Sequence, residues 1–435
     1  MKVNYFELAG MESRERERLC RRGGVNLRDL IGRVAPIIEE VRLRGDDAVR
    51  EFTRKFDGVD LEPSAFRVSH EEIDRARSSL SADLLEAMQV SIANIRTFHE
   101  RQLEPPLWEI EVSPGIFAGE KVVPLDSAGL YIPRGKGSFP SMMMMAGVPA
   151  KVAGVRRIAV VTPPDVNGRA DPATIAAASL IGLDEIYAIG GVQAVAALAL
   201  GTHTIQRVDK IVGPGSGYVL AAKQVLATEV DTGLPAGPSE AIVLADSSAD
   251  PLTVVTDLLI EAEHGPDSAA YLVTPDRSLA EKALEIIPRL VAGLPADRRS
   301  FCETVLQSNG GVVLADGIAD ALAFINQFAP EHLQILTENP LELLEQVKFA
   351  GEVLLGPYTP GTLANYSIGP NAILPTSGFA RTASALSVRD FTRRMSFSRV
   401  TESGFRDLAP KTLVLARYEG FAAHAAALVH RLEKW

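Results

Sequence analysis

The sequence predicts an α/β protein with two doubly wound, Rossmann-like parallel-sheet lobes, a helical N-terminal segment and a small C-terminal segment. Three observations support this prediction. Short apolar runs typical of buried strands alternate with helical segments along most of the chain. Glycine-rich loops follow two of these runs, and the alternation occurs in two series, before and after residue 240. Apolar residues make up 46% of the 435 residues, enough for a large core.

Residues 26–101 form a helical front end in this prediction. Leu30, Val34, Ile38 and Val41 recur at spacings of three and four residues, which is the period of a helix face, and residues 80–98 repeat the pattern.

The first series alternates strands and helices between residues 156 and 226. The expected strands are 156–162, 185–189 and 210–212, and the expected helices are 172–181, 192–200 and 218–226. Ligands of such sheets bind at the carboxyl ends of the strands. Gly213, Gly215 and Gly217 lie at such an end, where they serve either the phosphates of a nucleotide or only a tight turn.

The second series has expected strands at 241–245, 270–273, 311–314, 333–336 and 352–355. Residues 359–371 are too rich in turn-forming residues for a helix or a strand, and long irregular stretches are often functional. The chain ends in an alanine-rich helix with an apolar face. The resulting domain assignment is an N-terminal segment, 1–25; a first α/β lobe, 26–130 with 241–385; a second, nucleotide-associated lobe, 131–240; and a C-terminal segment, 386–435.

The composition excludes several classes of partner. A net charge of −11 argues against nucleic acid and anionic membranes. The N-terminus lacks the apolar core of a signal peptide and no apolar run is long enough to span a bilayer, so we expect a cytoplasmic protein. Cys20 and Cys302 have no CxxC spacing and indicate neither a disulfide framework nor a thiolate metal site.

Glu331 and His332 form an adjacent pair of titratable residues. Pro330 ends the preceding apolar helix, so the pair is expected on a helix-to-strand turn. A carboxylate and an imidazole there suit general acid–base catalysis. The alternative is a surface loop with two solvated side chains.

Glu261 and His264 form a second pair, three residues apart at the end of an expected helix, 252–264. Because this spacing places both on one helix face, they could share a divalent metal. The alternative is a hydrogen-bonded helix end.

Together these motifs resemble the histidinol dehydrogenase family, from about Gly23 to the C-terminus. The matches follow one another along the chain: Tyr131-Ile132-Pro133, 149–154, 211–215, 236–240, Ala262-Glu263-His264, 329–333, Gly369-Pro370-Asn371, 374–378, 386–391, and Glu419 with His424.

The resemblance implies a zinc enzyme that uses two NAD⁺ to oxidise L-histidinol to L-histidine through an aldehyde. Glu331 would activate the water that hydrates the aldehyde, and His332 would take the alcohol proton. The implied zinc ligands are Glu261, His264, Asn365 and His424; the implied substrate contacts are Ser239, Glu419, Asn365 and His332; and Tyr131, Gln193 and Ser216 would lie beside the nucleotide. The family also implies a homodimer whose exchanged C-terminal segments contribute Glu419 and His424 to the partner's site.

The sequence departs from the family pattern around this site. Glu261 replaces a Gln ligand and Asn365 replaces an Asp ligand, so the formal charge of the ligand set is preserved. Ala372 stands in place of a His, Ser216 in place of an Asn, and Gly265 in place of an Asp. We expect retained metal with altered geometry, and a pocket enlarged at Ala372.

Three functional alternatives follow from these departures. A paralogue would oxidise another small amino- or sulfo-alcohol to the acid. A protein of another class would keep the fold as a metal-free, non-catalytic binding protein. Arg134 and Lys136 indicate either extra phosphate affinity, as in an NADP-dependent reductase, or solvated loop cations.

Overall fold

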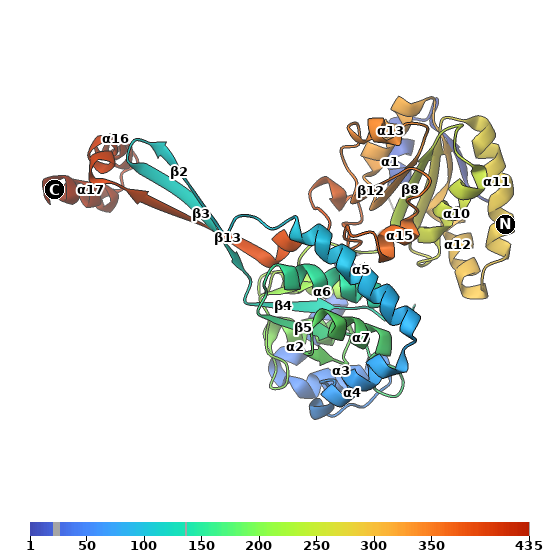
Figure 1. The fold of residues 1–435 in the computed structure, drawn as a ribbon, viewed down its shortest axis with the longest axis horizontal. Helices are drawn as coiled ribbons and strands as arrows, with labels where there is room; N and C mark the ends of the chain where they lie inside the picture. Colours follow the sequence, from blue (N-terminus) through green and yellow to red (C-terminus); the bar gives the residue numbers. More distant parts are fainter. Residues whose placement is uncertain (21–26, 135–136, 435) are drawn as a thin grey trace. The chain divides into compact units, whose positions relative to one another are not determined.

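The protein is described by a computed structural model over residues 1–20, 27–134 and 137–434 (Figure 1). The chain divides into two compact units. Unit 1 comprises Met1–Gln102 and Leu125–Phe391, and unit 2 comprises residues 103–124 and the chain from Thr392 onward.

Unit 1 contains two parallel sheets. One has six strands in the order β1-β10-β9-β8-β11-β12, and the other has four in the order β6-β5-β4-β7. These sheets confirm the predicted fold class. The six strands are β1 Tyr5–Glu7, β8 Glu240–Ala245, β9 Ala269–Thr274, β10 Gly310–Leu314, β11 His332–Leu336 and β12 Glu352–Leu355; the four are β4 Ser127–Tyr131, β5 Arg157–Val161, β6 Ile186–Tyr187 and β7 Lys210–Val212.

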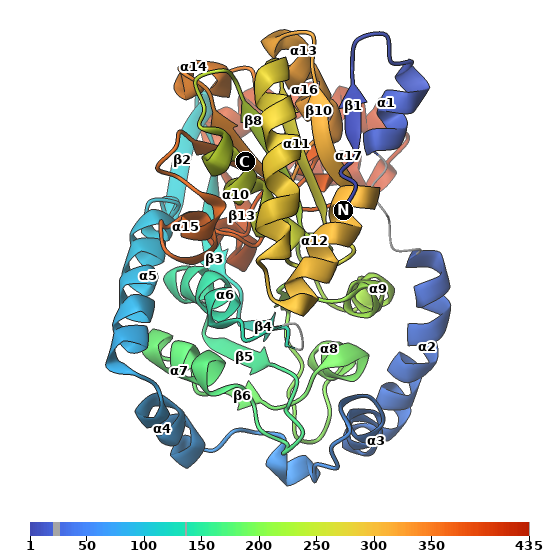
Figure 2. The ribbon, with the colours of Figure 1, turned by 90° about the vertical axis from the view of Figure 1, so that its right-hand side faces the viewer.

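Helices cover both faces of the four-stranded sheet (Figure 2). In β5, Ile158 and Val160 join the cluster with α4 to α7, whereas Ala159 and Val161 join the cluster with α2, α3, α8 and α9. This alternation is that of a strand buried on both faces. The helices are α2 Leu27–Arg44, α3 Asp46–Asp57, α4 His70–Ser79, α5 Ala82–Glu100, α6 Pro140–Val152, α7 Pro172–Ile181, α8 Gly191–Leu200 and α9 Gly217–Leu226.

The helical front end packs against this four-stranded sheet. Val34 and Ile38 of α2 share a buried cluster with Val195 of α8 and Ala222 of α9, and α5 packs on α6. The expected grouping of residues 26–130 with 241–385 therefore differs from the contacts of the structure. An apolar helix face fits either sheet, so the sequence pattern alone could not assign it.

The six-stranded sheet has α10, α11 and α12 on one face and α13 on the other. Its edge strand β1 lies within the N-terminal segment, which was expected to be helical. The sequence pattern did not reveal this strand because three residues are too few to show a strand period. The helices around this sheet are α1 Ser13–Cys20, α10 Pro251–Ala262, α11 Arg277–Ala292, α12 Ala296–Ser308, α13 Ile318–Phe328, α14 Pro340–Leu344 and α15 Gly361–Tyr366.

The short helix α15 corrects the prediction that residues 359–371 contain neither helix nor strand. Pro360 holds the extended N-cap position, where a missing N–H costs nothing, and the helix begins at Gly361. A Cβ at Gly361 would lie 3.6 Å from Ile260, so α15 packs closely on α10. Tertiary packing thus stabilises a helix that the local sequence disfavours.

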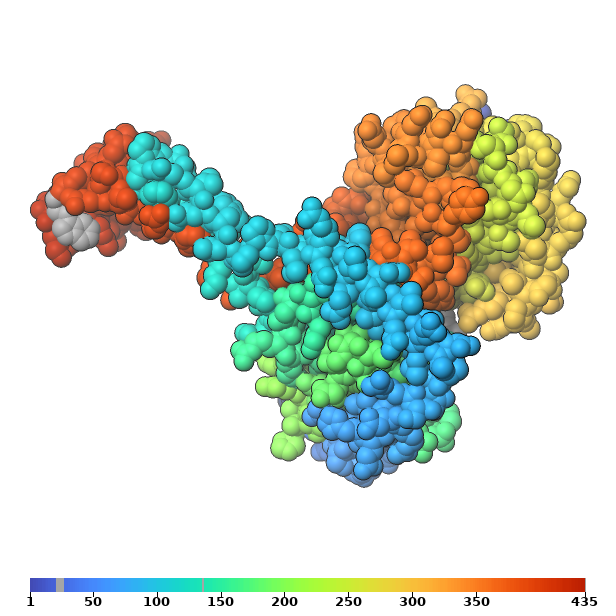
Figure 3. All heavy atoms as spheres, in the orientation of Figure 1, coloured from blue at the N-terminus to red at the C-terminus, as the bar shows by residue number. Residues whose placement is uncertain are grey.

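Unit 2 is a three-stranded antiparallel sheet, ordered β13-β3-β2, with two helices. Its surface includes the strands around residues 107–124, coloured cyan in Figure 3. Apolar residues alternate with glutamates along β2, and the apolar side chains of Trp108, Ile110 and Val112 are all exposed. The bounds are β2 Leu107–Ser113, β3 Ile116–Pro124, β13 Thr392–Val400, α16 Glu402–Tyr418 and α17 Ala422–Lys434.

Within the described residues of both units, no helix is long and apolar enough to cross a membrane.

Candidate active site

Glu331 and His332 lie where α13 turns into β11, as the sequence predicts, and His332 is the first residue of the strand. The turn begins at Ala329, whose φ of 53° is left-handed and unusual for a residue other than glycine. Such a conformation costs about 1–2 kcal/mol, so the surrounding contacts must enforce it. The backbone amides of Gly351 and Glu352 donate to the carbonyls of Pro330 and Glu331, each at 2.9 Å.

Both side chains are buried, which excludes the solvated-loop alternative. His332 Nδ1 lies 2.6 Å from Glu352 Oε1, and its Nε2 lies 3.8 Å from Glu331 Oε2 and 3.9 Å from Glu261 Oε1. Glu331 Oε2 accepts a hydrogen bond of 2.9 Å from the Glu240 amide. One imidazole is therefore surrounded by three carboxylates.

These contacts shift the proton affinities strongly. Burial alone would lower the pKa of His332, but the carboxylates of Glu261 and Glu331 raise it to about 10. Burial raises the pKa of Glu331 well above its usual value, although His332 opposes the shift. Strong shifts of this kind are typical of acid–base sites.

Three of the four expected metal ligands come together in unit 1. Glu261 lies in the last turn of α10, and His264 follows just beyond the helix end. Glu261 Oε2 is 3.5 Å from His264 Nδ1, and Oε1 accepts a 2.9 Å hydrogen bond from Asn365 Nδ2 of α15. Glu261 is buried, which by itself would raise its pKa, but His332 and His264 outweigh burial and lower it. Glu261 Oε2 is buried and makes no hydrogen bond of normal geometry to the described residues. A buried carboxylate oxygen without a partner, next to an imidazole, fits a cation.

In the described part of the chain, no group of three or more His, Cys, Asp or Glu side chains is arranged to hold a metal ion. The ligand set in unit 1 therefore depends on the Asn365 amide and on a further donor. Ser239, the expected substrate contact, lies beside this set, with Oγ 3.2 Å from His264 Nδ1.

The candidate residues lie at opposite ends of the two sheets. Ser239 precedes β8, His332 begins β11 and Glu352 begins β12, so the acid–base cluster is at the amino ends of the six-stranded sheet. The expectation that ligands bind at carboxyl ends was made for the strands of the first series and does not apply to this cluster. Tyr131 ends β4 and Gly213 follows β7, which places them at the carboxyl ends of the four-stranded sheet, where its strand order reverses.

A pocket of about 300 Å³ is lined by both lobes of unit 1. One side consists of Pro133, Arg134, Phe139 and residues 214–217, and the other of residues 237–239, His264, Asp267 and Ser268. The glycine-rich loop thus faces the Ser239 and His264 side of the acid–base cluster.

Comparison with known proteins matches residues 20–432 to the histidinol dehydrogenase family model. The chain is 48% identical over 426 residues to histidinol dehydrogenase of Synechocystis sp., covering 98% of both chains. It is 47% identical to a histidinol dehydrogenase homolog of Rhizobium meliloti, covering 98% of this chain and 94% of the relative. The chain belongs to the histidinol dehydrogenase family.

The fold of the family is also shared with a solved structure. The crystal structure of histidinol dehydrogenase from Elizabethkingia anophelis superposes with a TM-score of 0.94 at 35% identity, covering 99% of this chain and 98% of that one. Family membership makes the chain an oxidoreductase of this type. Its relatives include both histidinol dehydrogenases and proteins named homologs, so its substrate needs a separate argument.

The expected nucleotide residues are placed around the four-stranded sheet. Tyr131 is buried, and its hydroxyl accepts a 3.1 Å hydrogen bond from the Gly191 amide; burial raises its pKa to about 12. Gln193 is fully buried and donates to Asp57 Oδ2 at 3.3 Å. Ser216 is the N-cap residue of α9 and lines a second pocket, of about 670 Å³.

Arg134 is held by protein carbonyls, since its guanidinium donates to Arg169 O at 2.7 Å. Its Nη2 also lies 3.9 Å from Asp165 Oδ2. These contacts support neither of the two roles considered for it, because the partly buried cation is already paired within the protein. Lys136 lies outside the described residues.

Glu419 and His424 lie in unit 2, at the end of α16 and in α17. The ring of His424 lies 5.0 Å from that of Phe421. The distances around His332 and Glu261 therefore join residues of unit 1 alone.

The position of Ala372 differs from the expected one, which was at an enlarged pocket. It is buried in the apolar cluster that holds α5 to α7. Its neighbour Asn371 points inward as well, donating to Met145 O at 2.6 Å with His99 Nε2 3.3 Å away. Small size at position 372 thus serves core packing in unit 1.

Sequence reasoning missed Glu240 and Glu352, which both contact the catalytic pair. Neither stands in a motif that signals chemistry. Their proximity follows from strand register, which pairs His332 with Glu352 in β12 and with Ala241 in β8. The signal that the sequence offered for both residues was a glutamate at the first position of a strand next to β11.

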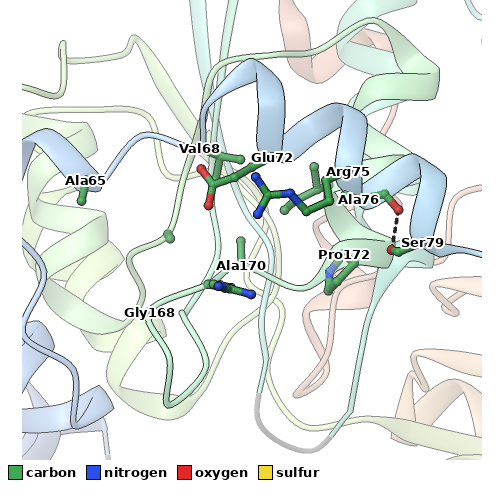
Figure 4. Close-up of a pocket in the computed structure, with 12 residues that line it drawn as sticks. Ala65, Val68, Glu72, Arg75, Ala76, Ser79, Gly168, Ala170 and Pro172 are labelled. Carbon is green, nitrogen blue, oxygen red and sulfur yellow. Dashed lines mark hydrogen bonds between the residues drawn. The ribbon is translucent and has the colours of Figure 1, made fainter.

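Another pocket of unit 1, about 220 Å³, lies between α4 and α7 (Figure 4). Its lining includes Glu72, Arg75 and Arg169 over an apolar floor that contains Val68 and Ile175. None of the expected site residues lines it.

Proposed function

We propose that the protein is a zinc-dependent, NAD-linked alcohol dehydrogenase that oxidises L-histidinol through L-histidinal to L-histidine. The observation that carries this proposal is the convergence of Glu331, His332, Glu261, His264 and Asn365 in one cluster of unit 1. A non-catalytic scaffold would have no physical need to bury three carboxylates around one imidazole.

The reaction requires two hydride transfers. His332 takes the hydroxyl proton while the carbinol hydride passes to NAD⁺, giving the aldehyde. Glu331 then takes a proton from the water that adds to the aldehyde carbon, and the hydride of the hydrate passes to a second NAD⁺, giving the acid. One alcohol, two NAD⁺ and one water thus give one carboxylate, two NADH and three protons.

Glu261, His264 and Asn365 would hold the zinc ion together with His424. Bound zinc supplies Lewis acidity, which lowers the free energy of negative charge on the substrate oxygen. The partnerless Oε2 of Glu261 supports this assignment, because it offers a buried anionic donor.

The nucleotide is proposed to bind across the crevice where the order of the four-stranded sheet reverses, close to Tyr131, Gln193 and Ser216. The N-termini of α8 and α9 offer backbone donors for phosphates. The 670 Å³ pocket beside Ser216 has an apolar lining that includes Pro36, Ile37, Phe52, Phe56 and Tyr218, which suits a flat aromatic base.

The charge of the cluster favours a cationic substrate. Glu261, Glu331 and Glu352 bring three carboxyl groups to within ion-pair distance of His332. A substrate ammonium is attracted to such a site and a sulfonate is repelled. An amino-alcohol such as histidinol therefore fits the described residues better than a sulfo-alcohol.

The exposed apolar stripe of β2 supports a homodimer. We propose that the C-terminal segment, 386–435, is exchanged between protomers, so that Glu419 and His424 complete the partner's site. Glu419 would contact the substrate there, as would Ser239.

The experiment that tests the function measures NADH formation at saturating zinc and NAD⁺. The substrates are histidinol, histidinal and a panel of small amino- and sulfo-alcohols. We expect two NADH per histidinol and faster turnover of histidinol than of any other member. Turnover of a sulfo-alcohol thousands of times faster would overturn the histidinol assignment but not the dehydrogenase assignment.

A further inference from the structure

The contact between His332 and Glu352 has no role in the reaction as proposed so far. The two residues open neighbouring parallel strands and are paired in register, so their side chains project from the same face of the sheet. His332 Nδ1 and Glu352 Oε1 are 2.6 Å apart, and each side chain is less than a tenth exposed. This is a short, charge-assisted hydrogen bond shielded from water.

Backbone contacts also fix the position of this pair. The Glu352 amide donates to Glu331 O and the Gly351 amide donates to Pro330 O. A Cβ at Gly351 would lie 2.5 Å from Glu331 O, so only glycine allows β12 to approach the catalytic turn this closely. The carboxylate of Glu352 therefore arrives at a fixed position beside the imidazole.

The hydrogen bond decides which ring nitrogen can act. Because Nδ1 donates to Glu352, the opposite nitrogen, Nε2, faces Glu331 and Glu261 at 3.8 and 3.9 Å. Rotation of the ring would break the Glu352 contact and turn Nε2 away from the cluster.

We propose that Glu352 is the positioning residue of the reaction: its carboxylate orients the His332 imidazole so that Nε2 faces the substrate hydroxyl and takes its proton. This inference rests on the proposed function for the role of His332. Glu352 itself touches neither substrate nor nucleotide, and it acts only through the imidazole.

The test compares substitutions at Glu352 with a matched control. Glu352→Ala removes the partner of His332; we expect kcat for histidinol to fall about 100-fold while KM for histidinol and NAD⁺ changes less than about threefold. Glu352→Gln keeps an acceptor for Nδ1 but loses the charge, and its kcat should fall about tenfold. If Glu352→Ala does not fold, Glu352→Asp replaces it, with an expected loss of about tenfold because the carboxylate is one methylene short.

The control is Asp257→Ala. Asp257 accepts a hydrogen bond of 2.5 Å from Gln334, two residues along β11 on the face that carries His332, so this variant also removes a buried carboxylate partner from the strand. We expect it to lower the unfolding temperature and to leave kcat within about threefold of the wild type. A loss of kcat in Glu352→Ala no larger than in Asp257→Ala would overturn the positioning role.

Crystal structures of the wild type and Glu352→Ala give a readout that does not depend on activity. A rotated or disordered His332 ring in the variant supports the proposal, and an unchanged ring overturns it. If the wild type oxidises no alcohol of the panel, the proposed function fails, and the ring orientation still decides whether Glu352 positions His332.

Discussion

At the scale of single residues, the site is defined by titratable groups that perturb one another. Nearby carboxylates raise the pKa of His332, and burial raises the pKa of Glu331, so each residue must release its proton before it can act as a base. The two residues nevertheless have separate tasks in the proposed reaction. His332 serves the first oxidation, and Glu331 is needed only when water enters.

Replacement of Glu331 by Gln tests that division. We expect Glu331→Gln to slow the oxidation of histidinal by about 10²–10⁴-fold and the oxidation of histidinol to the aldehyde by less than tenfold, since only the second step uses an activated water. Single-turnover measurements with each substrate separate the two steps. Equal slowing of both would assign Glu331 another role.

The metal assignment is tested at His264. Elemental analysis of protein purified without chelator should give one zinc per chain, and His264→Ala should reduce the zinc content severalfold at equal free zinc. The control is His70→Ala, at an exposed position at the start of α4, which should retain the metal. Wild-type protein that contains no metal after zinc is supplied would contradict the assignment.

At the scale of elements, the catalytic turn depends on the pairing of β11 with β12. The Pro330 and Glu331 carbonyls accept from the first amides of β12, and the left-handed Ala329 directs the chain into β11. No local pattern in the sequence encodes this arrangement, because the two segments meet only through the sheet.

Gly351→Ala should break this pairing. The added Cβ would lie 2.5 Å from Glu331 O and 3.2 Å from Leu374 Cβ, so β12 must move. We expect a loss of about 1–3 kcal/mol in the free energy of unfolding, together with a lower kcat. Denaturant unfolding and steady-state kinetics measure the two effects.

Gly32→Ala is the control for that substitution. Gly32 lies within α2, and a Cβ there would meet no atom within 4 Å. Alanine should stabilise this helix by about 0.5–1 kcal/mol and leave activity unchanged. A Gly351→Ala protein as stable and as active as the wild type would mean that β12 does not hold the turn.

At the scale of the whole molecule, unit 2 exposes an apolar face. Trp108 and Ile110 share one face of β2 and are 43% and 56% exposed. Val112, at an irregularity of the strand, is 61% exposed. A solvent-exposed apolar stripe on a strand is typical of an interface. Glu419 and His424 belong to this unit, and the proposed exchange would carry them to the site of the partner protomer.

Hybrid dimers test whether these residues act in trans. His332→Ala and His424→Ala homodimers should each be nearly inactive, whereas a hybrid of the two has one complete site. Random assembly from equal amounts should therefore restore about a quarter of the wild-type activity. Hybrids of His332→Ala with Glu331→Gln should show no recovery, because both changes lie in unit 1. A monomer by light scattering with full activity would contradict exchange.

The sequence by itself determined the parallel α/β architecture, the strands from β5 to β12 within a residue or two, and the turn that carries Glu331 and His332. These depend on apolar periodicity, on glycine and on proline, all of which are local properties. The same local pattern brought Glu261 and His264 together, because two residues three positions apart at a helix end lie on one face.

Only the tertiary structure decided which sheet the front-end helices cover, that α15 is helical, and that Ala372 belongs to the core. It also decided the contact of Glu352 with His332. The physical reason is that strand register and helix docking are set by contacts between residues far apart in the chain. Those contacts leave no periodic pattern in either segment alone.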